Sequence, residues 1–132
     1  MTAMLVQVNR RYTAPATAFT VDLLPSRVLG AAPAGESVAT STAEAFVTGG
    51  TGPFTYSWVR IGVAAPAGGF AADDAAAAQT AWLYGPLSSG FFFLEEWKCV
   101  VTDTATSVVR ESPVLQVTVQ EIPEPGFDPA TP

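Results

Sequence analysis

The most reactive side chains in this chain are one cysteine and two pairs of adjacent acids. Cys99 is the sole cysteine, and none of the 132 residues is a histidine that would act as its base. A cysteine nucleophile needs a base and an electropositive setting, because only the thiolate attacks. Cys99 lies instead in a run of aromatic and β-branched residues, so we expect a buried structural thiol without a catalytic role.

The acid pairs raise the question of a calcium site or of paired general acids. Calcium takes about six to eight oxygen ligands that converge from a spaced loop. Successive residues of a strand point to opposite faces, so Glu95 and Glu96 cannot both face one site. For Asp73 and Asp74 the sequence leaves open a helix cap, a solvated loop or a metal ligand. We expect no catalytic residue, no metal and no cofactor.

The glycine-rich turn GGTG, residues 49–52, raises the question of phosphate binding. A phosphate-binding loop needs a lysine and a helix after the glycines, so that backbone N–H groups surround the anion. Here Pro53 and the aromatic run FTYSW follow instead. We therefore interpret the turn as a corner before a buried strand, and the chain as a protein other than an enzyme.

The charge of the chain is low and unevenly distributed. Charged residues make up 14% of the sequence and hydrophobic residues 48%, which is enough to bury a core. The net charge of −6 argues against binding to nucleic acid. Residues 1–27 carry three basic residues and one acid, unlike the acidic remainder. No stretch approaches the roughly 20 apolar residues of a membrane span, and the N-terminus lacks a secretory-signal pattern.

Alternating short segments and turn residues predict an all-β protein of about seven strands. Residues 1–17 are expected to form an extended arm, residues 18–119 the folded domain, and residues 120–132 a flexible, Pro-rich acidic tail. The expected strands cover residues 18–24, 27–32, 38–47, 54–61, 79–84, 91–103 and 107–119, the last interrupted near Pro113. Period-2 alternation places six residues in the core: Phe54, Tyr56, Trp58, Trp97, Cys99 and Val101.

A tryptophan in one strand, and an aromatic residue two positions before a cysteine in another, is the core spacing of immunoglobulin-like domains. Residues 18–119 resemble such a domain, and TGGTGPFTYSW resembles the B–C corner of bacterial and phage Ig-like and PKD-like modules. The resemblance implies that Trp58 is the core tryptophan of strand C and that Cys99 occupies the strand F cysteine position. The strand B cysteine is missing, with Ala45 or Phe46 in its place, so the sandwich has no inter-sheet disulfide.

Two segments are candidate interfaces. At least one of three consecutive aromatic residues in a strand must face away from the core, so the run Phe91, Phe92 and Phe93 forms either an apolar contact patch or a segment covered by a loop. The arm is either a segment that pairs in extended form with a neighbouring subunit, favoured by apolar residues next to a basic pair, or an ordinary frayed terminus. The candidate interface residues of the arm are Leu5, Val6, Val8, Arg10 and Arg11.

The resemblance to phage modules, the low charge and the arm together predict a non-enzymatic structural protein of a virus particle. We expect a bacteriophage capsid decoration or tail-associated protein, assembled in the host cytoplasm, present in several copies or as a homo-oligomer, and bound to other virion proteins. We expect no contact with nucleic acid or membrane. The alternative is a secreted bacterial surface or carbohydrate-binding module in which Trp82 and Tyr84 stack weakly on glycans.

Overall fold

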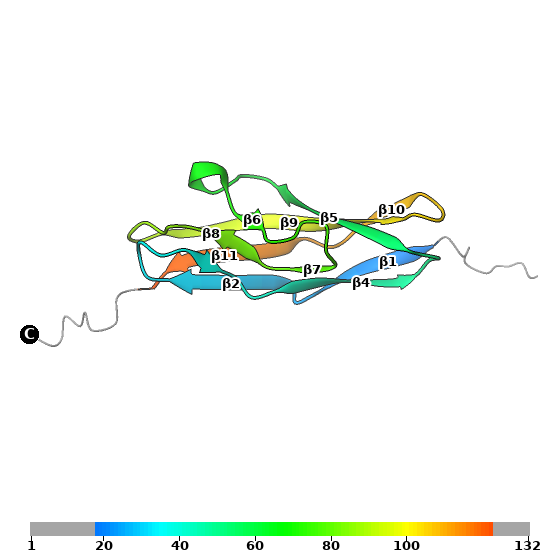
Figure 1. Cartoon of the computed structure of the whole chain (residues 1–132), viewed down its shortest axis with the longest axis horizontal. Coiled ribbons are helices and arrows are strands. Elements are labelled where there is room, and N and C mark those ends of the chain that lie inside the picture. The colour runs from blue at the N-terminus through cyan, green and yellow to red at the C-terminus, as the bar shows by residue number, and fades with distance from the viewer. Residues whose placement is uncertain (1–17, 123–132) are drawn as a thin grey trace, which may run out of the picture.

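One long strand, β9 (Phe92–Asp103), organises the computed structural model, which describes residues 18–122 (Figure 1). Strand β5 (Phe54–Ile61) pairs with one edge of β9 in antiparallel fashion. Strands β10 (Val108–Glu111) and β11 (Leu115–Glu121) pair in succession with its other edge. Strand β2 (Arg27–Ala32) then adds to β11 in parallel and completes a five-stranded sheet.

A second sheet faces the first and consists of β1 (Phe19–Leu24), β4 (Ala43–Gly49) and β7 (Gln79–Thr80). The chain passes from this sheet to the first between β1 and β2, at Pro25 and Ser26. Because proline has no N–H to donate to a strand ladder, Pro25 is suited to the point where the chain leaves one sheet for the other.

A small third sheet lies beside the sandwich. It contains β3 (Val38–Ala39), β8 (Trp82–Tyr84) and β6 (Ala71–Ala72), with β8 in the middle. A short 3-10 turn, η2 (Pro66–Gly68), precedes β6 and projects from the body of the molecule (Figure 1). The turn and β6 lie close to β8, and this proximity forms one wall of the site described below.

The core lies between the two main sheets and is dominated by three tryptophans. The ring of Trp82 stands edge-on to Trp58 and to Trp97, with centroids 5.3 and 5.6 Å apart. Such edge-to-face pairs add to the free energy gained by burying the rings. The fully buried side chains of the core also include Phe70, Leu115, Val28, Val101, Val117 and Val119.

The prediction of an all-β, immunoglobulin-like sandwich is confirmed, although two predicted strands are each split. The expected strand over residues 38–47 is wrong as one element, because the chain leaves β3 at Thr40 to reach β4 in another sheet. The Thr40 N–H donates to the Trp82 carbonyl at 2.9 Å, and the Thr40 hydroxyl oxygen accepts from the Trp82 N–H at 3.0 Å. Residues 79–84 likewise divide into β7 and β8.

One boundary differs from that expected, and the structure distinguishes between the alternatives for Asp73 and Asp74. Strand β11 continues to Glu121, beyond the expected end of the domain at Val119, and the Glu121 N–H donates to the Phe91 carbonyl at 2.8 Å. Asp73 and Asp74, for which a helix cap was one possibility, lie in a turn without a helix. The Asp74 carboxylate accepts from the Ala76 N–H at 3.0 Å within that turn.

Candidate functional site

The residues expected in the core lie on the inward faces of β5 and β9. The side chains of Trp58, Trp97, Cys99 and Val101 are buried, whereas those of Phe54 and Tyr56 are partly buried and pack against the core. Ala45 is buried and Phe46 is 42% exposed, so of the two residues considered for the place of the missing strand B cysteine, Ala45 is the one on the inward face of β4.

Cys99 is fully buried and has no base beside it in the described chain. Burial raises the pKa of its thiol to about 11, and a hydrogen bond with the Ser57 backbone offsets only part of this increase. The Cys99 N–H donates to the Ser112 hydroxyl oxygen at 2.9 Å. A thiol that is protonated and enclosed in this way is not a nucleophile.

Asp103 is the last residue in the row of inward-facing side chains on β9, and it fixes the conformation of the glycine-rich turn. Its carboxylate accepts from the Thr51 N–H at 2.8 Å, from the Gly52 N–H at 3.1 Å and from the Ala105 N–H at 3.1 Å. These bonds, with Thr51 the largest contribution, lower the pKa of the Asp103 carboxyl below its ordinary value of 3.8. The turn does surround an anion, and that anion is the protein's own carboxylate.

Glu95, near the start of the same row, is 1% exposed and fixes a second loop. Its carboxylate accepts from the Ala65 N–H at 2.7 Å and from the Phe70 N–H at 2.9 Å. It also accepts from the Trp97 indole N–H at 2.9 Å and from Arg60 Nε at 3.2 Å. Four hydrogen-bond donors therefore compensate the carboxylate of Glu95 for its burial, as a buried charge requires.

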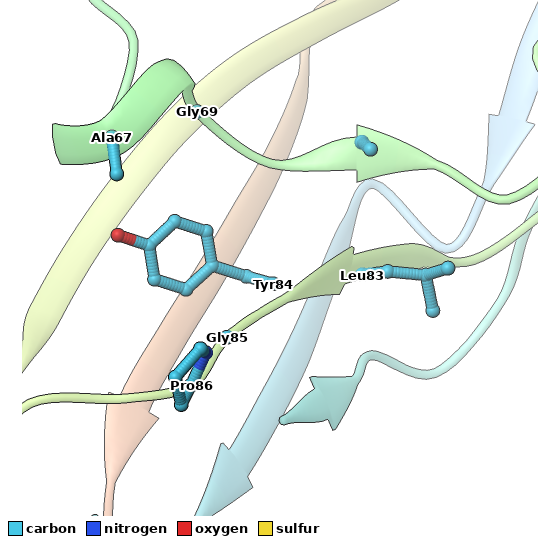
Figure 2. A pocket seen from close by; sticks show the side chains of 7 residues that line it. Ala67, Gly69, Leu83, Tyr84, Gly85 and Pro86 are labelled. Carbon is cyan, nitrogen blue, oxygen red and sulfur yellow. The ribbon is translucent and has the colours of Figure 1, made fainter. Parts of the chain in front are cut away.

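A hollow lies on the surface beside the loop that Glu95 holds through the Ala65 and Phe70 N–H groups (Figure 2). Figure 2 shows the Tyr84 ring between the η2 turn, at Ala67, and the Gly85 and Pro86 segment. The Tyr84 hydroxyl donates to the Pro66 carbonyl at 2.8 Å. We call this space, which measures about 370 Å³, the Tyr84 hollow; it is lined by Ala67, Gly69, Ala71, Leu83, Tyr84, Gly85 and Pro86.

The phenylalanine run divides between the interior and the surface. Phe91 stacks on Tyr84 with centroids 4.8 Å apart, and Phe93 stands edge-on to Phe70 at 6.3 Å. Phe92 points outward and is 63% exposed. Only the middle residue of the run is therefore a surface group, and the other two support the core and the Tyr84 hollow.

Phe92 belongs to a larger apolar face on the outer side of the five-stranded sheet. Pairing places Leu94 and Leu29 on either side of Thr118 in one row, and Phe92 next to Gln120 in the row beside it. The apolar face consists of Leu29, Phe92, Leu94 and Ile122, which are 52%, 63%, 40% and 42% exposed.

Other residues proposed from the sequence lie elsewhere. Trp82 is 0% exposed, so the idea that it stacks on glycans is wrong: its ring fills the core between Trp58 and Trp97. One face of Tyr84 is covered by Phe91. The arm residues fall outside the described part of the chain; they are Leu5, Val6, Val8, Arg10 and Arg11.

Within residues 18–122, no group of three or more acidic, cysteine or histidine residues is placed to hold a metal ion. The same part of the chain contains no helix long and apolar enough to cross a membrane. Sequence reasoning missed the buried role of Glu95 and the Tyr84 hollow. For Glu95 a signal existed, because Glu95, Trp97, Cys99, Val101 and Asp103 alternate with period 2.

Comparison with solved structures assigns the fold. The ASH/PapD-like domain of human CEP192 (PapD-like domain 7) is similar to this chain, with a TM-score of 0.63 and 12% sequence identity. The match covers 95% of this chain and 100% of that domain. No protein-family model and no curated protein matches the sequence. The protein is therefore an immunoglobulin-like β-sandwich with a PapD-like structural neighbour, a likeness that concerns the fold alone.

Proposed function

We propose that this chain is a non-enzymatic structural protein of a virus particle that binds other virion proteins through its apolar face. The observation that carries the proposal is the exposure of Leu29, Phe92 and Leu94 on one side of one sheet, at 52%, 63% and 40%. Apolar side chains gathered in this way on a protein surface mark sites of protein contact.

The chemistry of the buried polar groups supports a role without catalysis. Glu95 and Asp103 are both buried and both occupied by hydrogen bonds to loops of the protein itself. Cys99 is enclosed and its pKa is raised to about 11. These three groups stabilise the sandwich. The exposed apolar face therefore supports binding as the activity of the chain.

The virion context is supported by the likeness of the B–C corner to phage modules and by the arrangement of the two ends. Strand β1 begins at one end of the long axis, whereas β11 ends beside the apolar face at the other (Figure 1). The N-terminal arm and the apolar face would thus contact separate neighbours in a bacteriophage capsid or tail. Modest contacts suffice when many copies bind one particle.

Two experiments test this function. Mass spectrometry of particles purified from cultures that carry the gene is expected to detect the chain, and its absence from every particle would overturn the virion assignment. Deleting residues 1–16 is expected to leave the melting curve of the domain unchanged and to abolish incorporation. Truncated protein that reaches normal copy number would exclude the arm as an anchor while leaving the apolar face in place.

A further inference from the structure

The Tyr84 hollow has the chemistry of a site for an apolar segment. None of the seven residues that line it has a charged side chain or a side-chain amide, and the Tyr84 hydroxyl already donates to the Pro66 carbonyl. A sugar or a phosphate requires several convergent polar groups, which the side chains of this lining do not offer. Leu83, Tyr84 and Pro86 instead present aliphatic and aromatic surface to an occupant.

Both walls of the hollow are fixed before anything binds. A side chain at Gly69 would meet Arg60 at 2.5 Å and Glu95 at 2.8 Å, so this wall lies directly on the ion pair between Arg60 and Glu95. A side chain at Gly85 would come within 2.4 Å of the Ser37 backbone, so the opposite wall also rests on fixed structure. A preformed site does not spend binding free energy on ordering itself.

The described chain ends close to this hollow. The Glu121 N–H donates to the Phe91 carbonyl at 2.8 Å, and the Glu121 carboxylate accepts from the Gly90 N–H at 3.1 Å. Phe91 in turn stacks on Tyr84, with ring centroids 4.8 Å apart. Phe91 therefore contacts both the end of β11, through its backbone, and the Tyr84 ring that lines the hollow, through its side chain.

The segment that continues from there has a matching composition. The ten residues 123–132 include four prolines and one phenylalanine: Pro123, Pro125, Phe127, Pro129 and Pro132. An extended proline-rich segment advances about 3.1 Å per residue, so ten residues span roughly 31 Å, more than the distance across two adjacent rings. Proline-rich segments bind aromatic-lined grooves because little conformational freedom remains to be lost.

We propose that residues 123–132 bind in the Tyr84 hollow of the same molecule, with their proline and Phe127 side chains against Leu83, Tyr84 and Pro86. Attachment at Ile122 gives the segment an effective concentration in the millimolar range, so even a weak contact is populated. This site is separate from the apolar face, and the inference does not depend on the proposed function.

The test compares amide NMR spectra of the full chain and of a chain that ends at Ile122. Removal of residues 123–132 is expected to shift the signals of Gly69, Ala71, Leu83 and Gly85, while those of Leu29 and Leu94 in the apolar face stay in place. Adding a synthetic peptide of residues 123–132 to the shortened chain is expected to restore the original positions. A matched peptide in which the four prolines and Phe127 are replaced by alanine is expected to leave them shifted.

Two further measurements separate the outcomes. Leu83→Ser, a change at a half-exposed lining residue, is expected to weaken peptide binding roughly tenfold, whereas Phe92→Ser leaves it unchanged. Identical spectra before and after truncation would overturn the proposal. Shifts that grow with protein concentration would also overturn it, since they would place the segment in a neighbouring molecule. Shifts caused by added oligosaccharides, without any effect of truncation, would replace it with a glycan site.

Discussion

Glu95 and Asp103 lie on the same inward face of β9, and each carboxylate holds a different loop through backbone N–H groups. Glu95 fixes the loop that contains the η2 turn, and Asp103 fixes the glycine-rich corner before β5. The two acids thus determine the conformation of surface segments from inside the core. In this sandwich, buried carboxylates stand at both ends of a row whose middle is occupied by Trp97, Cys99 and Val101.

Replacing Glu95 by glutamine tests the role of the first acid. Glu95→Gln replaces one of the two accepting oxygens by an amide donor, so two of the four donors lose their acceptor, and we expect a loss of about 1–3 kcal/mol in the free energy of unfolding. Glu96→Gln is the matched control, because Glu96 is the exposed neighbour and its change is expected to stay within about 0.5 kcal/mol. Urea unfolding measures both. Equal stabilities for the two variants would contradict the Glu95 network.

Acid stability tests the role of Asp103. The pKa of its carboxyl is lowered in the folded state, so its contribution is complete at neutral pH and is lost as the pH falls below the ordinary value of 3.8. Asp103→Asn is therefore expected to lower the melting temperature at pH 7, with a difference from wild type that shrinks toward pH 2.5. A difference that is constant over this range would show that the charge of Asp103 contributes nothing.

Thiol labelling tests the burial of Cys99. With a pKa of about 11, its thiolate fraction at pH 8 is about one in a thousand, and the side chain is enclosed as well. We expect almost no reaction with an aromatic disulfide reagent in the native protein and full reaction of one thiol in urea. Rapid labelling under native conditions would contradict the position of Cys99 in the core.

Truncation of Trp58 tests the aromatic core. Trp58 is 3% exposed, and its indole N–H donates to the Ala77 carbonyl at 2.8 Å. Trp58→Ala is expected to cost about 3–5 kcal/mol, because a cavity replaces the ring. Phe46→Ala, a change at a 42% exposed aromatic residue of β4, serves as the control and is expected to cost far less. A melting temperature near that of wild type for Trp58→Ala would refute the core assignment.

Sequence periodicity was sufficient to predict the bounds of β5 and the inward-facing residues of β9. Alternation identifies which residues share a face, and β5 begins and ends at the residues expected, Phe54 and Ile61. Alternation does not say which sheet a strand joins. The split of residues 38–47 depends on pairing between Thr40 and Trp82, which lie far apart in the sequence and meet only in the folded protein.

The Glu95 network and the Tyr84 hollow could not be predicted from the sequence for a similar reason. A glutamate on an inward face is interpretable only when its donors are known, and two of the four donors of Glu95, Ala65 and Phe70, lie on a loop with no strong local pattern. The Tyr84 hollow is formed largely by small residues and backbone, which leave no compositional signal. By contrast, the outward position of one residue in the phenylalanine run follows from strand geometry, and Phe92 is that residue.

Binding of variants to purified particles tests the proposed docking most directly. Phe92→Asp places a charge within the apolar face, at its most exposed residue, and is expected to reduce co-sedimentation with particles more than about tenfold, with an unchanged melting curve. Val63→Asp, at a residue that is 76% exposed outside that face, is the matched control and is expected to bind as wild type does. Co-sedimentation of Phe92→Asp at the wild-type level would contradict docking through the apolar face.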